Sequence, residues 1–457
     1  MKRRISSSKI DGEINAPASK SAMIRAVAAA LLAKGTSEIV NPSFCTDGLT
    51  ALDIADTLGA EINYHAASRG ASKARQEYAM NHPTTSYRAN RGALTRGAIY
   101  RGERNITIKG NEGLKEKSIK SNFIDCGESG LCMRMFASIA SLLEEETTLE
   151  ASGSLLGRPV KMVEALRALG VTCRTEEGFP PIKVKGNITA GSIEINGAES
   201  SQFLTGLLMT LPLCSGDSRI KVIGLKSKPY VELTIDIMDR FGVTVLHDKD
   251  LREFYIQGGQ QYKPCACIIE GDWSGAAFFL VAGALAGSIK VKGLDPISYQ
   301  ADAAVIRALN HAGARVEAND DYILVAKDRL NAFEFDARDC PDLFPPLVAL
   351  GAGCLGKSII YGVERLKHKE SDRALALVEE FSKLGIEIRV FEDRMEVNGG
   401  TAWGGIVDSH NDHRIAMACA IAGIAGKGDV DIEGPACVSK SYPSFFEDLN
   451  SVKVKYE

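Results

Sequence analysis

Several features that mark specialised classes of protein are missing from this sequence of 457 residues. There is no apolar run of the roughly eighteen residues that a membrane-spanning helix needs. The eleven cysteines include no Cys-x-x-Cys pair, and the nearest two, Cys265 and Cys267, alternate as along a strand. We therefore expect reduced structural thiols, not disulfides or a metal centre. No Gly-rich nucleotide loop follows a suitable strand and no Ser-His-Asp signature occurs, so we expect no cofactor and no metal.

The composition is that of a globular protein, with 45% hydrophobic and 25% charged residues. The length allows two or three domains. A net charge of −4 argues against a general nucleic-acid surface, although clustered cations could still bind a small anionic ligand. Met1–Arg4 leads into polar Ser6–Ser8 and not into an apolar signal core, so we expect a cytoplasmic protein without a membrane partner.

Five segments share one pattern, an amphipathic helix that ends in glycine followed by Ala, Val or Ile and then by a β-rich stretch. The glycines are Gly59, Gly170, Gly242, Gly313 and Gly385, spaced by 111, 72, 71 and 72 residues. Glycine just past a helix is typical of a left-handed C-cap, so each marks a turn from helix to strand. The next stretch alternates as a β-hairpin, and another strand and helix come before. The predicted repeat is a β-α-β-α-β-β subdomain.

Five such units and the terminal pieces imply six subdomains. The helix from Ile415 lacks a following hairpin, which the N-terminal strand from Arg4–Ile5 to Ile14 could supply by closing the ring. We therefore predict a discontinuous domain of residues 1–18 with 268–457 and a second domain of residues 19–267, with three subdomains each. The first glycine spacing is about forty residues longer than the others. We assign the excess to a flexible insertion at residues 66–104, and a small role in binding an anion or a partner is the alternative.

The segment from Lys369 to Arg373 precedes apolar residues at helical spacing, so Ser371 is predicted as an N-cap and Arg373 falls in the first turn. A helix N-terminus disfavours a cation unless an anion binds in front of it. The same placement recurs at other predicted helix starts: Lys20 with Arg25, Arg134, Arg158 before Pro159, Lys228 before Pro229, and Arg414 after Asp412 and His413. Any one could be a solvated surface cation. Together they indicate a site for a ligand with several negative charges.

Neutral donors and acids accompany these cations. Ser200, Ser201 and Gln202 precede one predicted helix, and Ser227 and Tyr230 flank Pro229. Hydroxyls and an amide suit phosphate or sugar-like hydroxyl groups, while plain helix capping is the alternative for Ser200 and Ser201. The proton-transfer candidates are Glu370, Asp342, His413 and Lys20. A carboxylate among cations is normally ionised, so a catalytic acid needs ligand binding or burial to raise its pKa.

At these residues the chain resembles the 5-enolpyruvylshikimate-3-phosphate synthases (3-phosphoshikimate 1-carboxyvinyltransferases), a family of enolpyruvyl transferases. The resemblance covers nearly the whole chain except residues 66–104. Nine segments carry it in order: Ser19–Ser21 with Arg25, Arg158–Pro159, Ser200–Gln202, Ser227–Tyr230, Glu270–Asp272, Pro341–Asp342, Lys369–Arg373, Asp412–Arg414 and Lys440–Pro443. It implies a two-domain inside-out α/β barrel of six subdomains, with the active site in the cleft between the domains. It also implies transfer of the enolpyruvyl group of phosphoenolpyruvate to the 5-hydroxyl of shikimate 3-phosphate, with release of phosphate.

The resemblance assigns roles to the matching positions. Shikimate 3-phosphate would contact Lys20, Ser21, Arg25, Ser200, Ser201, Gln202, Ser227, Tyr230, Asp342 and Lys369. Phosphoenolpyruvate would contact Lys20, Gly130, Arg158, Gln202, Arg373, Arg414 and Lys440. Asp342 would be the base for the attacking hydroxyl, Glu370 or Lys20 would protonate the methylene carbon, and His413 is the further catalytic candidate. The expected partners are these two substrates alone, with a monomeric chain.

One segment departs from the family pattern. Glu128 stands where the family has an amide near phosphoenolpyruvate, and Leu131 stands where it has a hydroxyl. An ionised Glu128 that faced this anionic substrate would repel it, so we expect the side chain to turn aside or to pair with a lysine or arginine.

Two other functions remain open at this point. A related enolpyruvyl transferase acts on UDP-N-acetylglucosamine, but it lacks the Lys369–Arg373 segment and generally depends on a cysteine in a mobile loop. A non-catalytic repeat protein that binds anionic metabolites is the other alternative. Binding alone does not require Glu370, Asp342 and His413 to accompany the cations.

Overall fold

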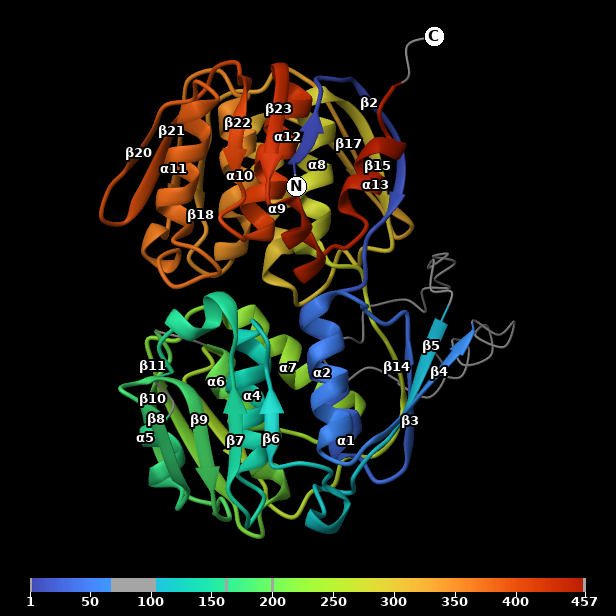
Figure 1. The fold of residues 1–457 in the computed structure, drawn as a ribbon, viewed down its shortest axis with the longest axis vertical. Coiled ribbons are helices and arrows are strands. Elements are labelled where there is room, and N and C mark those ends of the chain that lie inside the picture. The colour runs from blue at the N-terminus through green and yellow to red at the C-terminus, as the bar shows by residue number, and fades with distance from the viewer. Residues whose placement is uncertain (1, 67–103, 161–162, 199–200, 455–457) are drawn as a thin grey trace. The chain divides into compact units, whose positions relative to one another are not determined.

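The computed structural model describes residues 2–66, 104–160, 163–198 and 201–454, which divide into two compact units (Figure 1). Unit 1 consists of Met1–Pro17 with Gly271–Glu457, and unit 2 is Ala18–Glu270. The chain therefore passes from one unit to the other twice. The insertion expected at residues 66–104 lies outside the described residues, apart from its two ends.

Three four-stranded sheets form unit 2, and each consists of one parallel pair followed by two antiparallel pairs. The first sheet is β14 (Ala266–Ile268), β3 (Thr36–Val40), β5 (Arg104–Lys109) and β4 (Glu61–Ala66). The second is β6 (Phe123–Asp125), β7 (Thr147–Glu150), β9 (Phe179–Lys185) and β8 (Thr172–Glu176). The third is β10 (Ser192–Asn196), β11 (Ser218–Ile223), β13 (Glu253–Ile256) and β12 (Leu246–His247). The three sheets thus repeat one topology.

Unit 1 repeats the same topology in two sheets and shortens it in a third. The four-stranded sheets are β2 (Ile10–Asn15), β15 (Gly287–Lys292), β17 (Tyr322–Ala326) and β16 (Arg315–Ala318), and β18 (Glu334–Asp336), β19 (Lys357–Tyr361), β21 (Arg394–Asn398) and β20 (Ile388–Val390). The three-stranded sheet is β22 (Trp403–Asp408), β23 (Lys427–Glu433) and β1 (Lys2–Ile5). Six sheets accordingly correspond to the six predicted subdomains.

Two strands pair differently from the sequence-based expectation. The stretch from Arg4 to Ile14 is not one strand, because β1 pairs antiparallel with β23 while β2 pairs parallel with β15 in another sheet. Likewise β14, which we expected to begin a subdomain with the helix that follows it, pairs with β3 of unit 2. The choice of partner strand is a long-range event that local sequence patterns do not encode.

The helices of unit 2 are α1 (Lys20–Leu32), α2 (Thr46–Thr57), α4 (Gly130–Ala140), α5 (Val163–Ala168), α6 (Ser201–Thr210) and α7 (Lys228–Arg240). Those of unit 1 are α8 (Trp273–Ala286), α9 (Val305–Ala312), α10 (Phe344–Ala352), α11 (Arg373–Lys383), α12 (His413–Ala425) and α13 (Phe445–Ser451). Short 3-10 turns are η1 (Glu116–Ser118), η2 (Gly153–Gly157), η3 (Leu211–Leu213), η4 (Ala301–Ala304), η5 (Pro341–Leu343), η6 (Val363–Arg365) and η7 (Pro435–Lys440). In the described part of the chain, no helix combines the length and the apolar character needed to cross a membrane.

The core of each unit consists of helices that are apolar on every side. In unit 1, α8, α10 and α12 pack against one another, and every residue of α8 is buried (Figure 1). In unit 2, α1 is buried from Ala22 to Leu32, and α4 packs against α6. A helix without a polar face can only be stable inside a core, whereas amphipathic α11 exposes Leu375 and Glu379. All eleven cysteines are free thiols, which confirms the expectation of unpaired cysteines.

The five repeat glycines confirm the predicted helix ends. Their φ angles are +93° at Gly59, +88° at Gly170, +75° at Gly242, +87° at Gly313 and +79° at Gly385. A side chain is unfavourable in this left-handed region, which explains why the pattern needs glycine there. Each turn sends the chain directly into the first strand of a hairpin, so one residue type sets the geometry of five subdomains.

We expect Gly59→Ala to destabilise the protein more than Gly113→Ala. Both glycines have positive φ, +93° and +78°, so both substitutions introduce backbone strain of about 1 kcal/mol. A Cβ at Gly59 would lie 2.5 Å from the backbone oxygen of Ser118, while a Cβ at Gly113 meets nothing within 4 Å. Thermal unfolding should show the lower midpoint for Gly59→Ala, and equal midpoints would contradict the packing argument.

Candidate functional site

The predicted site residues of unit 1 lie in segments that follow the C-terminal ends of strands. Asp342 lies in η5 after β18, and Lys369, Glu370 and Arg373 lie between β19 and the first residue of α11. His413 and Arg414 begin α12 after β22, and Lys440 ends η7 after β23. Because these loops share one end of the unit's sheets, residues distant in sequence come within hydrogen-bonding distance.

The N-cap of α11 corrects the prediction made for Ser371. Asp372 is the cap, and its carboxylate accepts a hydrogen bond from the backbone N–H of Leu375 at 3.3 Å. The Ser371 hydroxyl instead donates to Asp412 Oδ2 at 3.1 Å. Both residue types cap helices well, and the contact with Asp412 decides between them. Arg373 is consequently the first residue of the helix, as close to its positive end as a side chain can be.

Arg373 is buried and contacts three carboxylates. Its Nε lies 2.7 Å from Asp412 Oδ2, its Nη1 lies 2.7 Å from Asp342 Oδ1, and its Nη2 lies 2.5 Å from Glu370 Oε2. Arg373 and Asp412 are 1% and 0% exposed, so their ion pair is shielded from water. Burial opposes the charge of Arg373, but Asp412, Glu370 and Asp342 outweigh it and raise its pKa. Three anions thus hold a cation that the helix terminus alone would disfavour.

Asp342 is the point where the unit 1 cations converge. Besides Arg373, it accepts from Lys369 Nζ at 3.2 Å and from Arg414 Nη2 at 3.1 Å. Burial lowers the pKa of Lys369, an effect that Asp342 opposes and Arg373 reinforces. Burial also opposes the charge of Arg414, but Asp342 outweighs it and the net pKa of Arg414 is raised. Three cations and the carboxylates of Asp342, Glu370 and Asp412 form one nearly neutral network.

Two further predicted residues border this network. Lys440 is buried, and its Nζ donates to the backbone oxygen of Asn411 at 2.7 Å, one residue before Asp412. The His413 side chain is 1% exposed, and its Nδ1 lies 3.8 Å from Asp412 Oδ1. The loop that carries Asp412 includes His410 and Asn411, both with φ of +51°. Left-handed non-glycine residues are strained, and such strain is typical of functional loops.

Asp302, in η4, is a buried acid that was not a predicted site residue. Its Oδ2 accepts a hydrogen bond from the Ser274 hydroxyl. Burial raises the pKa of Asp302 to about 7, Asp342 and Asp272 add to the rise, and Arg414 and the Ser274 bond oppose it. A carboxyl that titrates near neutrality beside the charged network couples the network to pH.

In unit 2, the cations of α1 are held by neighbouring helices. Lys20 is the first residue of α1, and its Nζ lies 3.0 Å from Asp47 Oδ2 in the first turn of α2. Arg25 is 1% exposed; it donates through Nε to Thr234 Oγ1 at 2.8 Å and through Nη2 to the backbone oxygen of Tyr230 at 3.3 Å, both on α7. Burial lowers the pKa of Arg25 to about 10.

A second group in unit 2 surrounds the start of α4. Gly130 is the first residue of this helix, and a Cβ there would lie 2.6 Å from Arg134 Nη1. Arg134 is the fifth residue of the helix, not its start as expected, and its Nη1 donates to Gln202 Oε1 at 2.9 Å. Arg158 is buried and donates through Nη2 to Ser154 Oγ at 2.9 Å. It follows η2, and Pro159 does not begin the next helix, because α5 starts at Val163.

The neutral donors occupy helix starts as predicted, with one outside the described residues. Ser201 is the first residue of α6 and is buried, while Ser200 lies outside the described residues. Ser227 is the N-cap of α7, buried, with φ of +55°. Ser21 and Tyr230 are half-buried. Ser227 in front of α7 is thus a strained backbone position, like His410 and Asn411 in front of α12.

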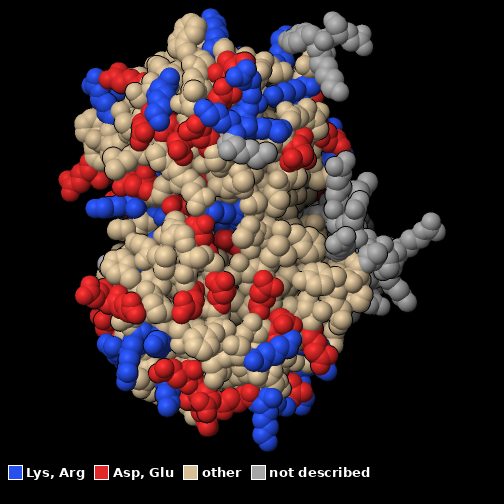
Figure 2. Space-filling model, in the orientation of Figure 1, with Lys and Arg blue, Asp and Glu red and all other residues tan. Residues whose placement is uncertain are grey.

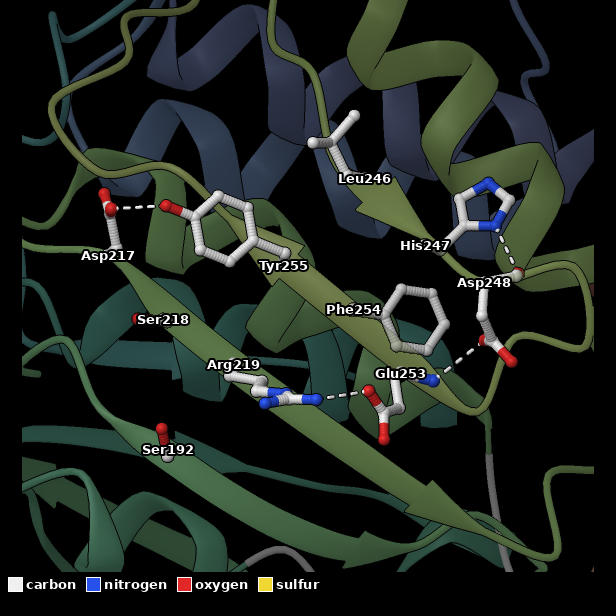
Figure 3. A pocket seen from close by; sticks show the side chains of 10 residues that line it. All are labelled: Ser192, Asp217, Ser218, Arg219, Leu246, His247, Asp248, Glu253, Phe254 and Tyr255. Carbon is white, nitrogen blue, oxygen red and sulfur yellow. Dashed lines mark hydrogen bonds and ion pairs between the residues drawn. The ribbon is translucent and has the colours of Figure 1, made fainter.

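A surface hollow of about 610 Å³ lies elsewhere, on the sheet of β10, β11, β13 and β12 (Figure 3). Its polar side chains bond to one another: Arg219 Nη2 lies 2.5 Å from Glu253 Oε2, and the Tyr255 hydroxyl donates to Asp217 at 2.5 Å. No predicted site residue within the described ranges lines it. The faces in Figure 2 show acids and bases interspersed over each unit. Neither feature competes with the charged clusters as a functional site.

Sequence analysis identified Asp342 and Glu370 but missed other acids near the cations. Asp412 was noted only as part of a helix start, and Asp47 and Asp302 were not noted. Asp412 is the N-cap of α12, with its carboxylate accepting from the N–H of Arg414 at 2.9 Å, and capping chemistry could have identified it. No local pattern marks Asp47 or Asp302 as a partner of distant residues.

Comparison with known proteins gives one family. The model of EPSP synthase (3-phosphoshikimate 1-carboxyvinyltransferase) matches residues 5–98 and 95–449. A 3-phosphoshikimate 1-carboxyvinyltransferase of Clostridium novyi is 37% identical over 452 residues, covering 98% of this chain and 97% of the relative. One of Methanocorpusculum labreanum is 34% identical over 455 residues, covering 99% and 98%.

Solved structures show the same fold. An EPSP synthase from Acinetobacter baumannii superposes with a TM-score of 0.75 at 22% identity, covering 100% of this chain and 99% of that chain. An enolpyruvyl transferase from Streptomyces tendae gives a TM-score of 0.70 at 17% identity, covering 98% and 96%. These likenesses confirm the predicted two-domain α/β fold.

The raised pKa of Asp302 predicts a pH-dependent effect of Asp302→Asn on stability. The folded chain keeps the Asp302 proton up to about pH 7, while the unfolded chain loses it near pH 4. As pH rises from 4 to 7, the free energy of unfolding therefore falls by on the order of 4 kcal/mol, because the buried group must be ionised or keep a proton that the unfolded chain has lost. The amide introduced by Asp302→Asn has no such cost, and its oxygen can still accept from Ser274.

The difference in thermal midpoint between Asp302→Asn and the unsubstituted protein should therefore move in favour of the variant from pH 5 to pH 8. The exposed Asp320→Asn is the matched control. A difference that is the same at both pH values would show that Asp302 does not titrate in this range.

Proposed function

The chain belongs to the EPSP synthase (3-phosphoshikimate 1-carboxyvinyltransferase) family, and from this membership we propose how its residues perform the family's reaction. The enzyme transfers the enolpyruvyl group of phosphoenolpyruvate to the 5-hydroxyl of shikimate 3-phosphate and releases phosphate. This is a step of the shikimate pathway to the aromatic amino acids. Both substrates carry several negative charges, which suits a protein with cations at its helix starts.

Phosphoenolpyruvate is bound by cations of both units, and two of these cations, Arg373 and Arg414, already have anionic partners. Arg373, Arg414 and Lys440 of unit 1 and Arg158 of unit 2 bind its phosphate and carboxylate, with Lys20, Gly130 and Gln202 completing the contacts. The observation that carries this proposal is the set of three carboxylates around Arg373, at 2.5 to 2.7 Å. These anions keep the guanidinium in place without substrate, so little reorganisation is needed when a phosphate replaces one of them.

Shikimate 3-phosphate is bound mostly by neutral donors of unit 2. The proposed contacts are Ser21, Ser200, Ser201, Gln202, Ser227 and Tyr230, together with Lys20, Arg25, Asp342 and Lys369. The buried hydroxyls of Ser201 and Ser227 support this role, because helix-start hydroxyls and amides suit phosphate and hydroxyl groups without adding charge. Lys20 serves both substrates.

The chemistry is an addition followed by an elimination. Glu370 or Lys20 protonates the methylene carbon of phosphoenolpyruvate, the 5-hydroxyl oxygen bonds to the adjacent carbon, and Asp342 accepts the hydroxyl proton. The tetrahedral ketal phosphate then loses a proton from its new methyl group and expels phosphate. Arginine and lysine contacts stabilise the charges of this intermediate. The atoms balance without a cofactor.

Asp342 needs substrate to become a base. Its oxygens are occupied by Lys369, Arg373 and Arg414. Anionic substrate draws these cations away, so that an oxygen of Asp342 can accept the hydroxyl proton. His413, buried beside Asp412, is the remaining proton-transfer candidate.

The family comparison sets aside the two alternative functions. The curated relatives are named as transferases that act on 3-phosphoshikimate, not on UDP-N-acetylglucosamine. Ten of the eleven cysteines are buried, and burial raises the pKa of thiols such as Cys173, which makes them poor nucleophiles. The relatives match over nearly their full length and are named as enzymes, which argues against a non-catalytic binding protein. We further propose that the enzyme acts as a monomer in the cytoplasm, with no nucleic-acid or membrane partner.

Release of inorganic phosphate tests the reaction. The purified protein should release phosphate only when shikimate 3-phosphate and phosphoenolpyruvate are both present, because the leaving group departs only after the hydroxyl has added. Incubation with each substrate alone is the control. Binding of shikimate 3-phosphate without any phosphate release would contradict the proposed reaction.

Glu370→Gln tests the proton-transfer assignment. The amide keeps the size of the side chain but cannot carry the proton, so turnover should fall by at least about 100-fold while both substrates still bind. Glu379→Gln, at an exposed position on α11, is the matched control. Steady-state rates with substrate binding by calorimetry separate the two effects, and near-normal turnover would remove Glu370 from the mechanism.

A further inference from the structure

Glu128, the residue that departs from the family pattern, points toward η2. Its Oε2 accepts two hydrogen bonds from one residue, from the backbone N–H of Ser154 at 2.9 Å and from the Ser154 hydroxyl at 2.7 Å. Glu128 directly precedes Ser129, the N-cap of α4. The carboxylate therefore joins the start of α4 to the turn that leads to Arg158.

The Ser154 hydroxyl is the link between Glu128 and Arg158. A carboxylate can only accept, so the single hydroxyl hydrogen of Ser154 points to Glu128. The oxygen of the same hydroxyl then offers its lone pairs to Arg158, whose Nη2 donates to it at 2.9 Å. Ser154 and Arg158 are four residues apart across η2, a spacing at which side chains on a helical turn meet. The acceptor oxygen of Glu128 thus sets the direction of the Ser154 hydroxyl, and Arg158 can only donate to that hydroxyl.

The backbone around Ser154 has room for this carboxylate only because residue 153 is glycine. Gly153 has φ of +51°, and a Cβ there would lie 2.5 Å from Cδ of Glu128. A residue with a side chain would displace Glu128 from Ser154. The contact therefore depends on two positions, one before α4 and one in η2.

We propose that Glu128 is a positioning residue that acts through Ser154 to orient the guanidinium of Arg158 for the phosphoenolpyruvate anion. The inference rests on the proposed role of Arg158 in binding this substrate. It extends the expectation that Glu128 turns aside or pairs with a cation: the carboxylate bonds to Ser154, which in turn accepts from Arg158. Orientation of Arg158 affects binding of phosphoenolpyruvate more than binding of shikimate 3-phosphate, because Arg158 is not among the proposed contacts of shikimate 3-phosphate.

Four variants distinguish a relay from repulsion and from a purely structural role. Glu128→Leu and Ser154→Ala each interrupt the relay, so each should raise KM for phosphoenolpyruvate about tenfold, the value of one hydrogen bond to a charged group. Glu128→Gln keeps an acceptor oxygen and should stay within about twofold of the unsubstituted enzyme. The double variant Glu128→Leu with Ser154→Ala should raise KM for phosphoenolpyruvate by no more than about tenfold. Two substitutions that interrupt the same chain of hydrogen bonds do not have additive effects. KM for shikimate 3-phosphate and the thermal midpoint should change little in all four.

Each alternative predicts a different pattern. If Glu128 repelled the substrate, Glu128→Gln would lower KM for phosphoenolpyruvate. If the two links acted independently, the double variant would reach about 100-fold, and unchanged KM in Glu128→Leu would overturn the relay outright. Arg158→Ala is the reference: it should raise KM for phosphoenolpyruvate by about 100-fold or more. An unchanged KM in Arg158→Ala would contradict the assignment of Arg158. An unchanged KM in Glu128→Leu together with a raised KM in Arg158→Ala would contradict only the relay.

Discussion

The buried ion pair between Arg373 and Asp412 is the constraint on which the unit 1 site depends. An arginine that is 1% exposed at the positive end of a helix is tolerable only with fixed anions around it. Asp412 supplies one and also caps α12, so the same carboxylate fixes the starts of two helices. Asp342 and Glu370 complete the balance. The residues proposed for acid–base chemistry are therefore also the ones that keep the cations in place before substrate arrives.

Unit 2 meets the same requirement by other means. Arg25 and Arg158 are buried against hydroxyl and carbonyl oxygens: Thr234, Tyr230 and Ser154. These oxygens are neutral, whereas three carboxylates surround Arg373 in unit 1. Glu128 is two hydrogen bonds away from Arg158, by way of Ser154. The buried arginines of the two units thus have acceptors of different charge.

Local patterns predicted what local forces determine. The glycine spacing identified five helix ends, and the cations at helix starts identified Lys20, Lys228, Arg373 and Arg414, because both features depend on backbone geometry within one turn. The cap at Ser371 was wrong by one residue, because Asp412, from a different helix, takes the serine hydroxyl. The partners of β2 and β14 and the roles of Asp47, Asp302 and Ser154 depend on contacts between segments far apart in sequence. The chemical role of each site residue stays a prediction from family resemblance.

The discontinuity of unit 1 has a consequence for synthesis of the chain, because its first strands are made before unit 2. During synthesis β1 and β2 emerge first, yet their partners β23 and β15 follow only after all of unit 2, which is contiguous and can complete its sheets earlier. Waiting strands expose unpaired edges that invite aggregation. The positive charges of β1 oppose such pairing. In the folded register, Lys2 and Arg4 lie opposite Glu433 and Asp431 and form ion pairs of 2.9 and 2.8 Å with them. The basic residues of β1 thus oppose pairing with a wrong strand and match the acidic residues of β23 once that strand is made.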